Sequence, residues 1–390
     1  AREAGAALAY VNMVGGQDEL VFDGDSIIVD ATGNLLARGP KFTEDLLVAD
    51  LDLPAAEGAF EPGETPVSGH DGTTITIDRR LVSADPVPPY EPAAPRLVEP
   101  LDDPAEVYGA LVLGVRDYVR KNGFRSAILG LSGGIDSALV ATIAADAIGP
   151  ENVHVVLMPS RYSSDHSITD AEELVRRQGV HARTVPIHDI VKAYEADLDL
   201  HGLAAENLQA RIRGNILMGL SNEHGHLVLT TGNKSELATG YSTLYGDSAG
   251  GYGPIKDVPK TLVFELSRWR NDQTEGVVPP IPQNIIDKPP SAELRPDQKD
   301  TDSLPDYDTL DALLDDYVEN DLGHDALIEA GHDPALVDRV IAMVDRAEYK
   351  RRQYPPGPKI SPKNFGRDRR LPITNAWREP PSTPPKASPY

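Results

Sequence analysis

The chain has 390 residues, more than one ordinary domain holds, so we expect two lobes. Its 61 acidic and 37 basic residues give a net charge of −24, which argues against broad nucleic-acid binding. No apolar run approaches the roughly 18 residues of a membrane span, and no residue is cysteine, which excludes disulfides and thiol nucleophiles within the chain. We therefore expect a cytoplasmic protein with no membrane and no nucleic-acid partner.

Residues 1–53 read as a β-rich segment. Short apolar runs predict strands at 7–11, 19–22, 26–30 and 44–51. Turns are predicted at Gly15-Gly16, Asp23-Gly24 and 32–34. Fifty residues of strands are typical of a part of a domain rather than a whole one.

Residues 54–102 are predicted to be a linker. Six prolines between Pro86 and Pro100 exclude a continuous helix and a central strand. We expect an extended connector that follows a surface.

From residue 103 the pattern changes to alternating helices and strands. Asp103-Pro-Ala-Glu106 is a helix-start signal, and Val107, Leu111, Val115 and Val119 then keep one apolar face. Strands are predicted at 126–131, 153–158, 182–187 and 227–231. This order predicts an α/β fold with a doubly wound parallel sheet, in which the first loop from strand to helix binds phosphates.

That first loop is Ser132-Gly-Gly-Ile-Asp-Ser137, and it opens a helix that we expect to end at Gly149. Two glycines let backbone N–H groups surround an anion at the positive end of the helix. Asp136 would repel phosphate unless a divalent cation bridges them, so the loop predicts bound Mg²⁺. The alternative is an ordinary turn with Asp and Ser as helix caps; the complete hexapeptide favours the phosphate site.

A second set of residues follows the strand predicted at 227–231. Thr231 and Glu236 would reach the same sheet edge as Asp136, giving two carboxylates for Mg²⁺ on a triphosphate. Lys260 suits the neutralisation of a leaving pyrophosphate. The alternative for Glu236 is a solvated carboxylate in the first turn of a helix, and the alternative for Lys260 is a surface lysine.

His224-Gly-His226 has a spacing that a metal could use, but no third ligand is evident nearby in the sequence. We therefore favour a turn between a helix and a strand at this point.

The loop is the signature of the ATP pyrophosphatases, and residues 103–371 resemble the synthetase domain of the bacterial glutamine-dependent NAD synthetase family. The motifs that carry the resemblance are 131–137 (LSGGIDS), 206–215 (ENLQARIRGN), 231–236 (TGNKSE), 245–247 (YGD), 269–271 (WRN) and 348–353 (EYKRRQ). The resemblance implies a carbon–nitrogen ligase of the adenine nucleotide α-hydrolase fold type. Such an enzyme would convert nicotinic acid adenine dinucleotide (deamido-NAD), ATP and ammonia to NAD, AMP and pyrophosphate.

The resemblance also implies roles for individual residues. ATP would bind Gly130, Leu131, Ser132, Gly133, Gly134, Ile135, Asp136, Ser137, Thr231, Lys260 and Ser291. Deamido-NAD would bind Asn207, Arg211, Glu236 and Lys350, and Mg²⁺ would bind Asp136 and Glu236. Asp136 and Lys260 are the expected catalytic residues. Ammonia-only relatives carry a lysine where Leu244 stands, so that contact is expected to be absent or replaced.

Residues 9–24 resemble the later part of the nitrilase-like glutaminase domain fused to such synthetases. The family's Glu-Lys-Cys triad lies before this motif, so we expect a fragment or a natural truncation without glutaminase activity of its own. The predicted organisation is 1–53, the end of a nitrilase-like α/β sandwich; 54–102, a linker; 103–371, the synthetase domain; and 372–390, a tail. We also expect a homo-oligomer that uses ammonia derived from glutamine in the full-length enzyme.

Other enzymes of the same fold amidate or thiolate xanthosine monophosphate, aspartate or tRNA, and these are the rival functions. Absence of cysteine disfavours sulfur transfer, and the net charge of −24 disfavours tRNA. A non-catalytic nucleotide-binding protein is a rival of another class, which Asp136 and Glu236 argue against.

Overall fold

The computed structural model describes residues 1–53, 61–83, 85–86, 88–94, 96–296 and 298–375. The chain divides into two compact units: residues 1–12 with 24–100, and residues 13–23 with 101–390. The predicted tail lies mostly outside the described residues. Within the described part, no helix is long and apolar enough to cross a membrane.

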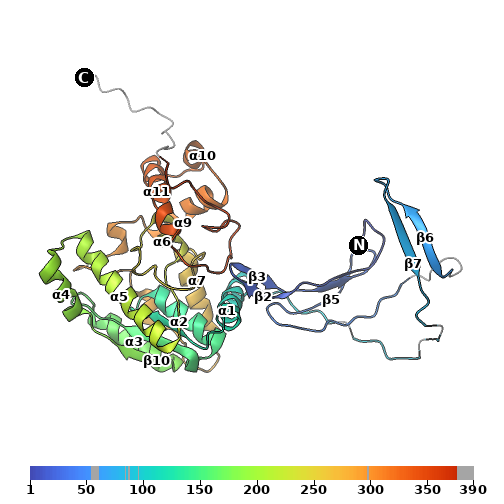
Figure 1. Cartoon of the computed structure of the whole chain (residues 1–390), viewed down its shortest axis with the longest axis horizontal. Helices are drawn as coiled ribbons and strands as arrows, with labels where there is room; N and C mark the ends of the chain where they lie inside the picture. Colours follow the sequence, from blue (N-terminus) through green and yellow to red (C-terminus); the bar gives the residue numbers. More distant parts are fainter. Residues whose placement is uncertain (54–60, 84, 87, 95, 297, 376–390) are drawn as a thin grey trace, which may run out of the picture. The chain divides into compact units, whose positions relative to one another are not determined.

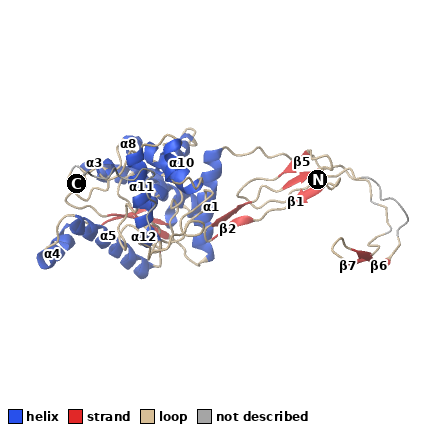
Figure 2. Ribbon diagram, turned by 90° about the horizontal axis from the view of Figure 1, so that it is seen from above, coloured by secondary structure: helices blue, strands red, loops and turns tan. Residues whose placement is uncertain are grey.

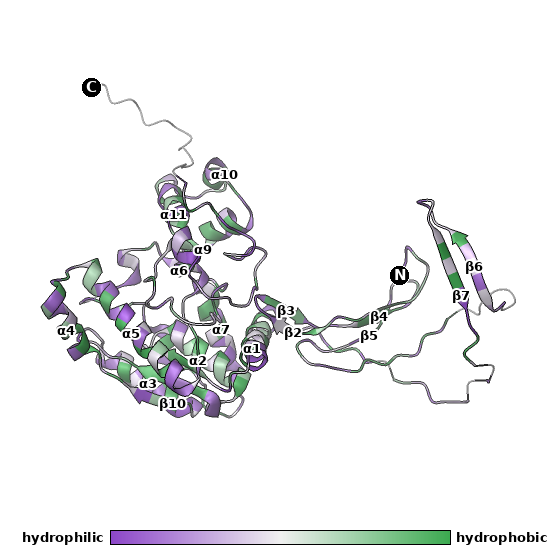
Figure 3. Ribbon diagram, in the orientation of Figure 1, coloured by the Kyte–Doolittle hydropathy of each residue, from purple (hydrophilic) through white to green (hydrophobic). Residues whose placement is uncertain are grey.

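The first unit consists of strands (Figure 1). An antiparallel sheet joins β1, β4 and β5 in that order, and β6 and β7 form a separate hairpin. Their bounds are β1 (Leu8–Tyr10), β4 (Ile27–Val29), β5 (Leu35–Arg38), β6 (Gly63–Ser68) and β7 (Thr74–Arg79). Hydrophobic and hydrophilic residues both occur along the β6–β7 hairpin in Figure 3, and every residue of its two strands is exposed.

Three local predictions for the first hundred residues were wrong. No strand forms at 44–51, where Leu46 and Val48 are exposed and lack the neighbouring strand that a ladder of hydrogen bonds requires. Gly15-Gly16 is not a turn but lies within strand β2 (Val14–Gln17). The β6–β7 hairpin interrupts the region expected to be an extended connector, before its proline-rich end.

The second unit holds a four-stranded parallel sheet in the order β10-β9-β8-β11, with helices around it (Figure 1). The strands are β8 (Ala127–Gly130), β9 (Val153–Leu157), β10 (His181–Thr184) and β11 (Leu227–Val228). The helices are α1 (Asp103–Lys121), α2 (Ile135–Ile148), α3 (Asp165–Gln178), α4 (His188–Leu198), α5 (Leu203–His224), α6 (Lys234–Thr239), α7 (Lys260–Asp272), α8 (Gln283–Asp287), α9 (Tyr307–Leu314), α10 (His324–Glu329), α11 (Pro334–Arg346) and α12 (Glu348–Arg351). Short turns are η1 (Pro150–Asn152), η2 (Asp300–Asp302) and the π-helical η3 (Asp315–Glu319).

Helices cover both faces of this sheet, because successive side chains of its strands point to opposite faces and are buried on both. On β8, Ala127 and Leu129 pack in one core with α1, α2 and α7, whereas Ile128 packs in a second core with α4 and α5. A third core joins α6, α9, α10 and α11. The predicted α/β fold with a doubly wound parallel sheet is thus confirmed.

The N-cap of helix α1 lies one residue before the position that the sequence predicted. The N-cap is Asp102, whose carboxylate accepts a hydrogen bond from the backbone N–H of Ala105 (2.8 Å). Asp103 and Pro104 occupy the first helical positions, where proline loses no hydrogen bond. Helix α2 ends at Gly149, as predicted, with a φ of 85° there.

Residues 13–23 fold as a hairpin on the second unit. Its strands β2 and β3 (Leu20–Asp23) contact α1, beside which Figure 2 draws β2. Gly16 donates its N–H to Asp117 Oδ2 (2.8 Å) and accepts from Lys121 Nζ (2.7 Å). A Cβ on Gly16 would lie 3.2 Å from the Cα of Gly114, so the glycine permits the close approach of strand and helix.

His226 directly precedes β11, as the predicted turn between helix and strand requires, and its ring stacks on His154 with centroids 4.1 Å apart. The His154 ring also stacks on His181 (4.9 Å). Burial, and then the neighbouring histidines, lower the pKa of both His154 and His226 below the ordinary 6.5.

The contribution of His154 and His226 to the stability of the second unit is therefore expected to fall as the pH drops through about 6.5, because the unfolded chain takes up these protons more readily than the folded one. The check is the melting temperature between about pH 7.5 and pH 5 for the wild type and for His154→Asn, which should lose part of this pH dependence. His70→Asn, an exposed position in the first unit, is the control. An unchanged pH dependence in His154→Asn would contradict the prediction.

Candidate active site

The loop between β8 and α2 has the geometry of an anion site. Gly133 has a φ of 82°, and a Cβ there would lie 2.2 Å from the backbone oxygen of Ser167, so only glycine fits. Hydrogen bonds hold the loop closed: Gly134 N–H donates to Ser132 Oγ (3.1 Å), and Ser137 Oγ donates to the Gly134 carbonyl (3.0 Å). Its backbone N–H groups stand at the N-terminus of a 14-residue helix.

The loop that follows β11 meets the first loop through Asn233. The Asn233 side chain donates to Asp136 Oδ1 (2.9 Å) and also accepts from the Glu236 N–H (3.0 Å) as the N-cap of α6. The Glu236 carboxylate accepts in turn from the Asn233 N–H (3.3 Å). Asn233 thus holds both carboxylates, that of Asp136 through its side-chain amide and that of Glu236 through its backbone N–H. The site lies where the chain passes from the β9 side of β8 to the β11 side, which is the topological switch point of such sheets.

Lys260, the first residue of α7, lies between these two carboxylates. Its side chain is only 1% exposed, which excludes the alternative of a surface lysine. Its Nζ donates to Asp136 Oδ2 and lies 3.8 Å from Glu236 Oε1. Its backbone N–H donates to Ser235 Oγ (2.9 Å), so the α6 segment also sets where α7 begins.

The charges at this site are unbalanced. Burial and the neighbouring Asp136 raise the pKa of Glu236 well above its ordinary value, and burial raises the pKa of Asp300. Burial alone would lower the pKa of Lys260, but Asp136 and Glu236 outweigh it and raise it. Several carboxyl groups thus lie near one ammonium group, and a cation bound beside them would favour their ionised forms.

The residues predicted to hold the second substrate gather around residues 240–247. Asn207 Oδ1 accepts from Thr243 Oγ1 (2.8 Å), and Arg211, one turn further along α5, donates to the Leu244 carbonyl (3.2 Å). Lys350, on α12, donates to two carbonyls of the same segment, those of Gly240 and Ser242, at 2.7 Å each. Residues from two helices far apart in the sequence thus contact one loop, and that loop directly follows the helix carrying Glu236.

The other predicted residues fall in different places. Gly130 ends β8, Leu131 and Ile135 are buried, and Thr231 is half-buried just after β11. The hydrogen bonds that Ser291 makes stay within its own loop: it donates to the Gln298 carbonyl (2.5 Å) and accepts from the Glu293 N–H (3.2 Å).

Three residues at the site were missed by the sequence predictions: Asn233, Asp300 and Tyr307. Tyr307 donates to Asp300 Oδ2 (2.9 Å), and its ring lies 5.3 Å from Lys260 Nζ. Asn233 could have been found, because an asparagine three residues before a glutamate is a helix-capping signal. Asp300 and Tyr307 carry no such local signal.

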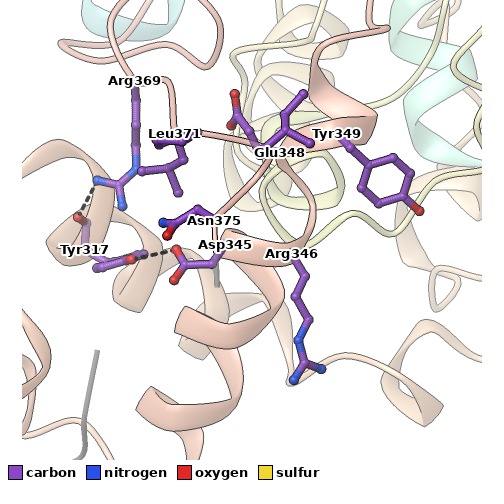
Figure 4. A pocket seen from close by; sticks show the side chains of 10 residues that line it. Tyr317, Asp345, Arg346, Glu348, Tyr349, Arg369, Leu371 and Asn375 are labelled. Carbon is purple, nitrogen blue, oxygen red and sulfur yellow. Dashed lines mark hydrogen bonds between the residues drawn. The ribbon is translucent and has the colours of Figure 1, made fainter. Parts of the chain in front are cut away.

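A cavity of about 370 Å³ lies elsewhere in the second unit, and Figure 4 shows its side chains. In this cavity the Arg369 guanidinium donates a hydrogen bond to the Tyr317 carbonyl (3.4 Å), and the Tyr317 hydroxyl donates to Asp345 Oδ1 (3.2 Å). None of the predicted site residues lines it.

The chain is similar to known proteins over most of its length. A family model described as NAD synthase matches residues 107–354, and one described as Carbon-nitrogen hydrolase matches residues 1–59. The chain is 48% identical to the glutamine-dependent NAD(+) synthetase of Acinetobacter baylyi over 377 residues, which are 95% of this chain and 63% of the relative. The chain spans less than two thirds of the length of this relative and of those from Aquifex aeolicus and Thermotoga maritima.

Two solved structures are also similar to this chain. The glutamine-dependent NAD+ synthetase of Acinetobacter baumannii, solved with adenosine diphosphate, is 42% identical with a TM-score of 0.60, covering 97% of this chain and 64% of that one. NMN synthetase from Francisella tularensis is 27% identical with a TM-score of 0.54, covering 64% of this chain and 96% of that one.

Proposed function

Because the chain belongs to the NAD synthase family, we propose that its second unit amidates deamido-NAD to NAD at the expense of ATP. The carboxylate would first be adenylated, with release of pyrophosphate; ammonia would then displace AMP. In the full-length enzyme the ammonia would come from glutamine. The observation that carries the proposal is the buried Lys260 between Asp136 and Glu236, beside a glycine loop at a helix N-terminus.

The residues of the chain would act mainly by position and charge. Backbone N–H groups of the loop 132–137 would bind the ATP phosphates, and Lys260 would neutralise the leaving pyrophosphate. Asp136 and Glu236 fit Mg²⁺ in donor type, since it prefers carboxylate oxygens, and phosphate oxygens and water would complete its ligands. When bound, the ion would polarise the phosphates and offset their charge. A cytoplasmic homo-oligomer stays a prediction.

ATP–pyrophosphate exchange tests this function directly. Exchange that depends on deamido-NAD supports adenylation of that acceptor and excludes a non-catalytic nucleotide-binding protein. The similarity to an NMN synthetase makes the corresponding nicotinic acid mononucleotide the acceptor to compare. Exchange with the mononucleotide alone would replace deamido-NAD in the proposal.

Lys350→Ala is expected to raise the KM for deamido-NAD well above any change for ATP, because Lys350 and Arg211 offer the positive charge for an anionic dinucleotide. Steady-state kinetics with each substrate varied measure the effect. Lys192→Ala, at an exposed position of α4, is the control. Equal effects on both substrates would assign Lys350 a structural role, through its bonds to residues 240 and 242.

The 390-residue chain is expected to make NAD from ammonium salts but not from glutamine, because the family's glutaminase reaction needs a thiolate and these residues include no cysteine. The assay supplies glutamine as the only nitrogen source after removal of free ammonia. Sustained formation of glutamate and NAD would require another nucleophile.

A further inference from the structure

The turn of the hairpin 13–23 is built into the second unit. The carbonyl of Asp18 accepts from the Tyr252 hydroxyl (3.3 Å), and the carbonyl of Glu19 accepts from the Lys359 N–H (2.7 Å). Tyr252 is fully buried. A stretch matched by the carbon-nitrogen hydrolase model therefore completes the packing of the unit matched by the NAD synthase model.

The Glu19 side chain pairs with a buried lysine. Lys256 Nζ lies 3.4 Å from Glu19 Oε1, and the two side chains are only 7% and 19% exposed. Burial lowers the pKa of Lys256, whereas the charge of Glu19 and its hydrogen bond act to raise it. Glu19 therefore helps to keep a positive charge at a place where water cannot solvate it well.

Lys256 begins the short segment 256–260, which ends at the active-site lysine. The next residue, Asp257, pairs with Lys234 Nζ (2.9 Å) and accepts from the Ile360 N–H (2.9 Å). The Val258 carbonyl accepts from the Lys234 N–H (2.9 Å). The segment is thus attached to Glu19 at its start, to the α6 region in its middle, and to Asp136 and Glu236 at its end.

We propose that Glu19 is a positioning residue for the amidation reaction: by pairing with the buried Lys256 charge, it keeps that charge from pulling the segment 256–260 out of place, so that Lys260 lies between Asp136 and Glu236. The inference rests on the proposed function for its kinetic consequence only. Without the Glu19 carboxylate, the Lys256 ammonium would gain by moving toward water, and the backbone leading to Lys260 would move with it. Small displacements of a group that stabilises charge lower the rate more than they lower substrate affinity.

The experiment uses the full chain with Glu19→Gln, which removes the charge and keeps the shape. We expect kcat for ammonium-dependent NAD formation to fall by about tenfold or more, with KM for ATP and deamido-NAD changed by less than about twofold. Hydrogen–deuterium exchange should increase at the backbone amides of residues 256–258 and 260. Glu265→Gln, an exposed carboxylate on α7, is the matched control and should behave as the wild type.

A double variant, Glu19→Gln with Lys256→Met, separates charge from bulk structure. Removing both partners leaves no buried unpaired charge, so the double variant should recover most of the lost kcat and the slow exchange. Wild-type kcat and exchange in Glu19→Gln would overturn the inference, as would a double variant as slow as the single one. If Glu19→Gln does not fold, the double variant is compared with the wild type: a kcat close to that of the wild type supports the inference, and a much lower kcat overturns it. A wild type that makes no NAD would refute the proposed function, while the exchange data would still test the role of Glu19.

Discussion

Asp136→Asn is expected to lower NAD formation by about a hundredfold or more, because the carboxylate is proposed to hold Mg²⁺ and lies directly on Lys260. The variant should stay folded, since Glu236 and Asp300 still face the lysine and loss of one carboxylate relieves their mutual repulsion. Steady-state rates at saturating ATP and deamido-NAD, with Mg²⁺ varied, give the measurement.

Asp272→Asn, an exposed position near the end of α7, is the matched control for that variant. Activity of Asp136→Asn within about threefold of the wild type would refute the proposed metal contact, because loss of a catalytic metal ligand should cost several kcal/mol. The melting temperature separates lost chemistry from lost folding.

Gly133→Ala is expected to destabilise the second unit by about 3 kcal/mol, from an unfavourable φ and from overlap with backbone. The added Cβ would lie 2.2 Å from the Ser167 carbonyl oxygen, which belongs to the first turn of α3 and cannot rotate away as a side chain could. The melting temperature should fall by roughly 10 °C, and the phosphate loop should lose its shape.

Gly134→Ala provides the comparison for stability. Gly134 has an ordinary φ of −85°, and its added Cβ would meet only the Ser132 hydroxyl, at 3.3 Å. Its melting temperature should therefore fall much less than that of Gly133→Ala. Equal losses in the two variants would show that the contact with Ser167 does not limit the loop.

The sequence by itself determined the fold class, the family and the phosphate loop of this protein. These depend on local patterns: alternation of helices and apolar strands, and two glycines followed by Asp136 between a strand and a helix. The resemblance to glutamine-dependent NAD synthetases, read from motifs in the right order, is confirmed by the comparisons. The predicted roles of single site residues stay predictions.

Tertiary structure decided which of these residues meet. The sequence left open whether Lys260 is a surface residue; its burial between Asp136 and Glu236 follows from how α7 starts against α6. Asn233, Asp300 and Tyr307 reach the site from separate segments, so no local spacing predicts them.

The same reason explains the errors near the start of the chain. Gly15-Gly16 reads locally as a turn, but these residues form a strand because Gly16 must fit against Gly114 on α1, about a hundred residues later. Likewise, only long-range packing brings Glu19 to Lys256. A residue's own neighbours in sequence set its backbone preferences, whereas contacts between distant segments depend on the whole packed core, which only the tertiary structure specifies.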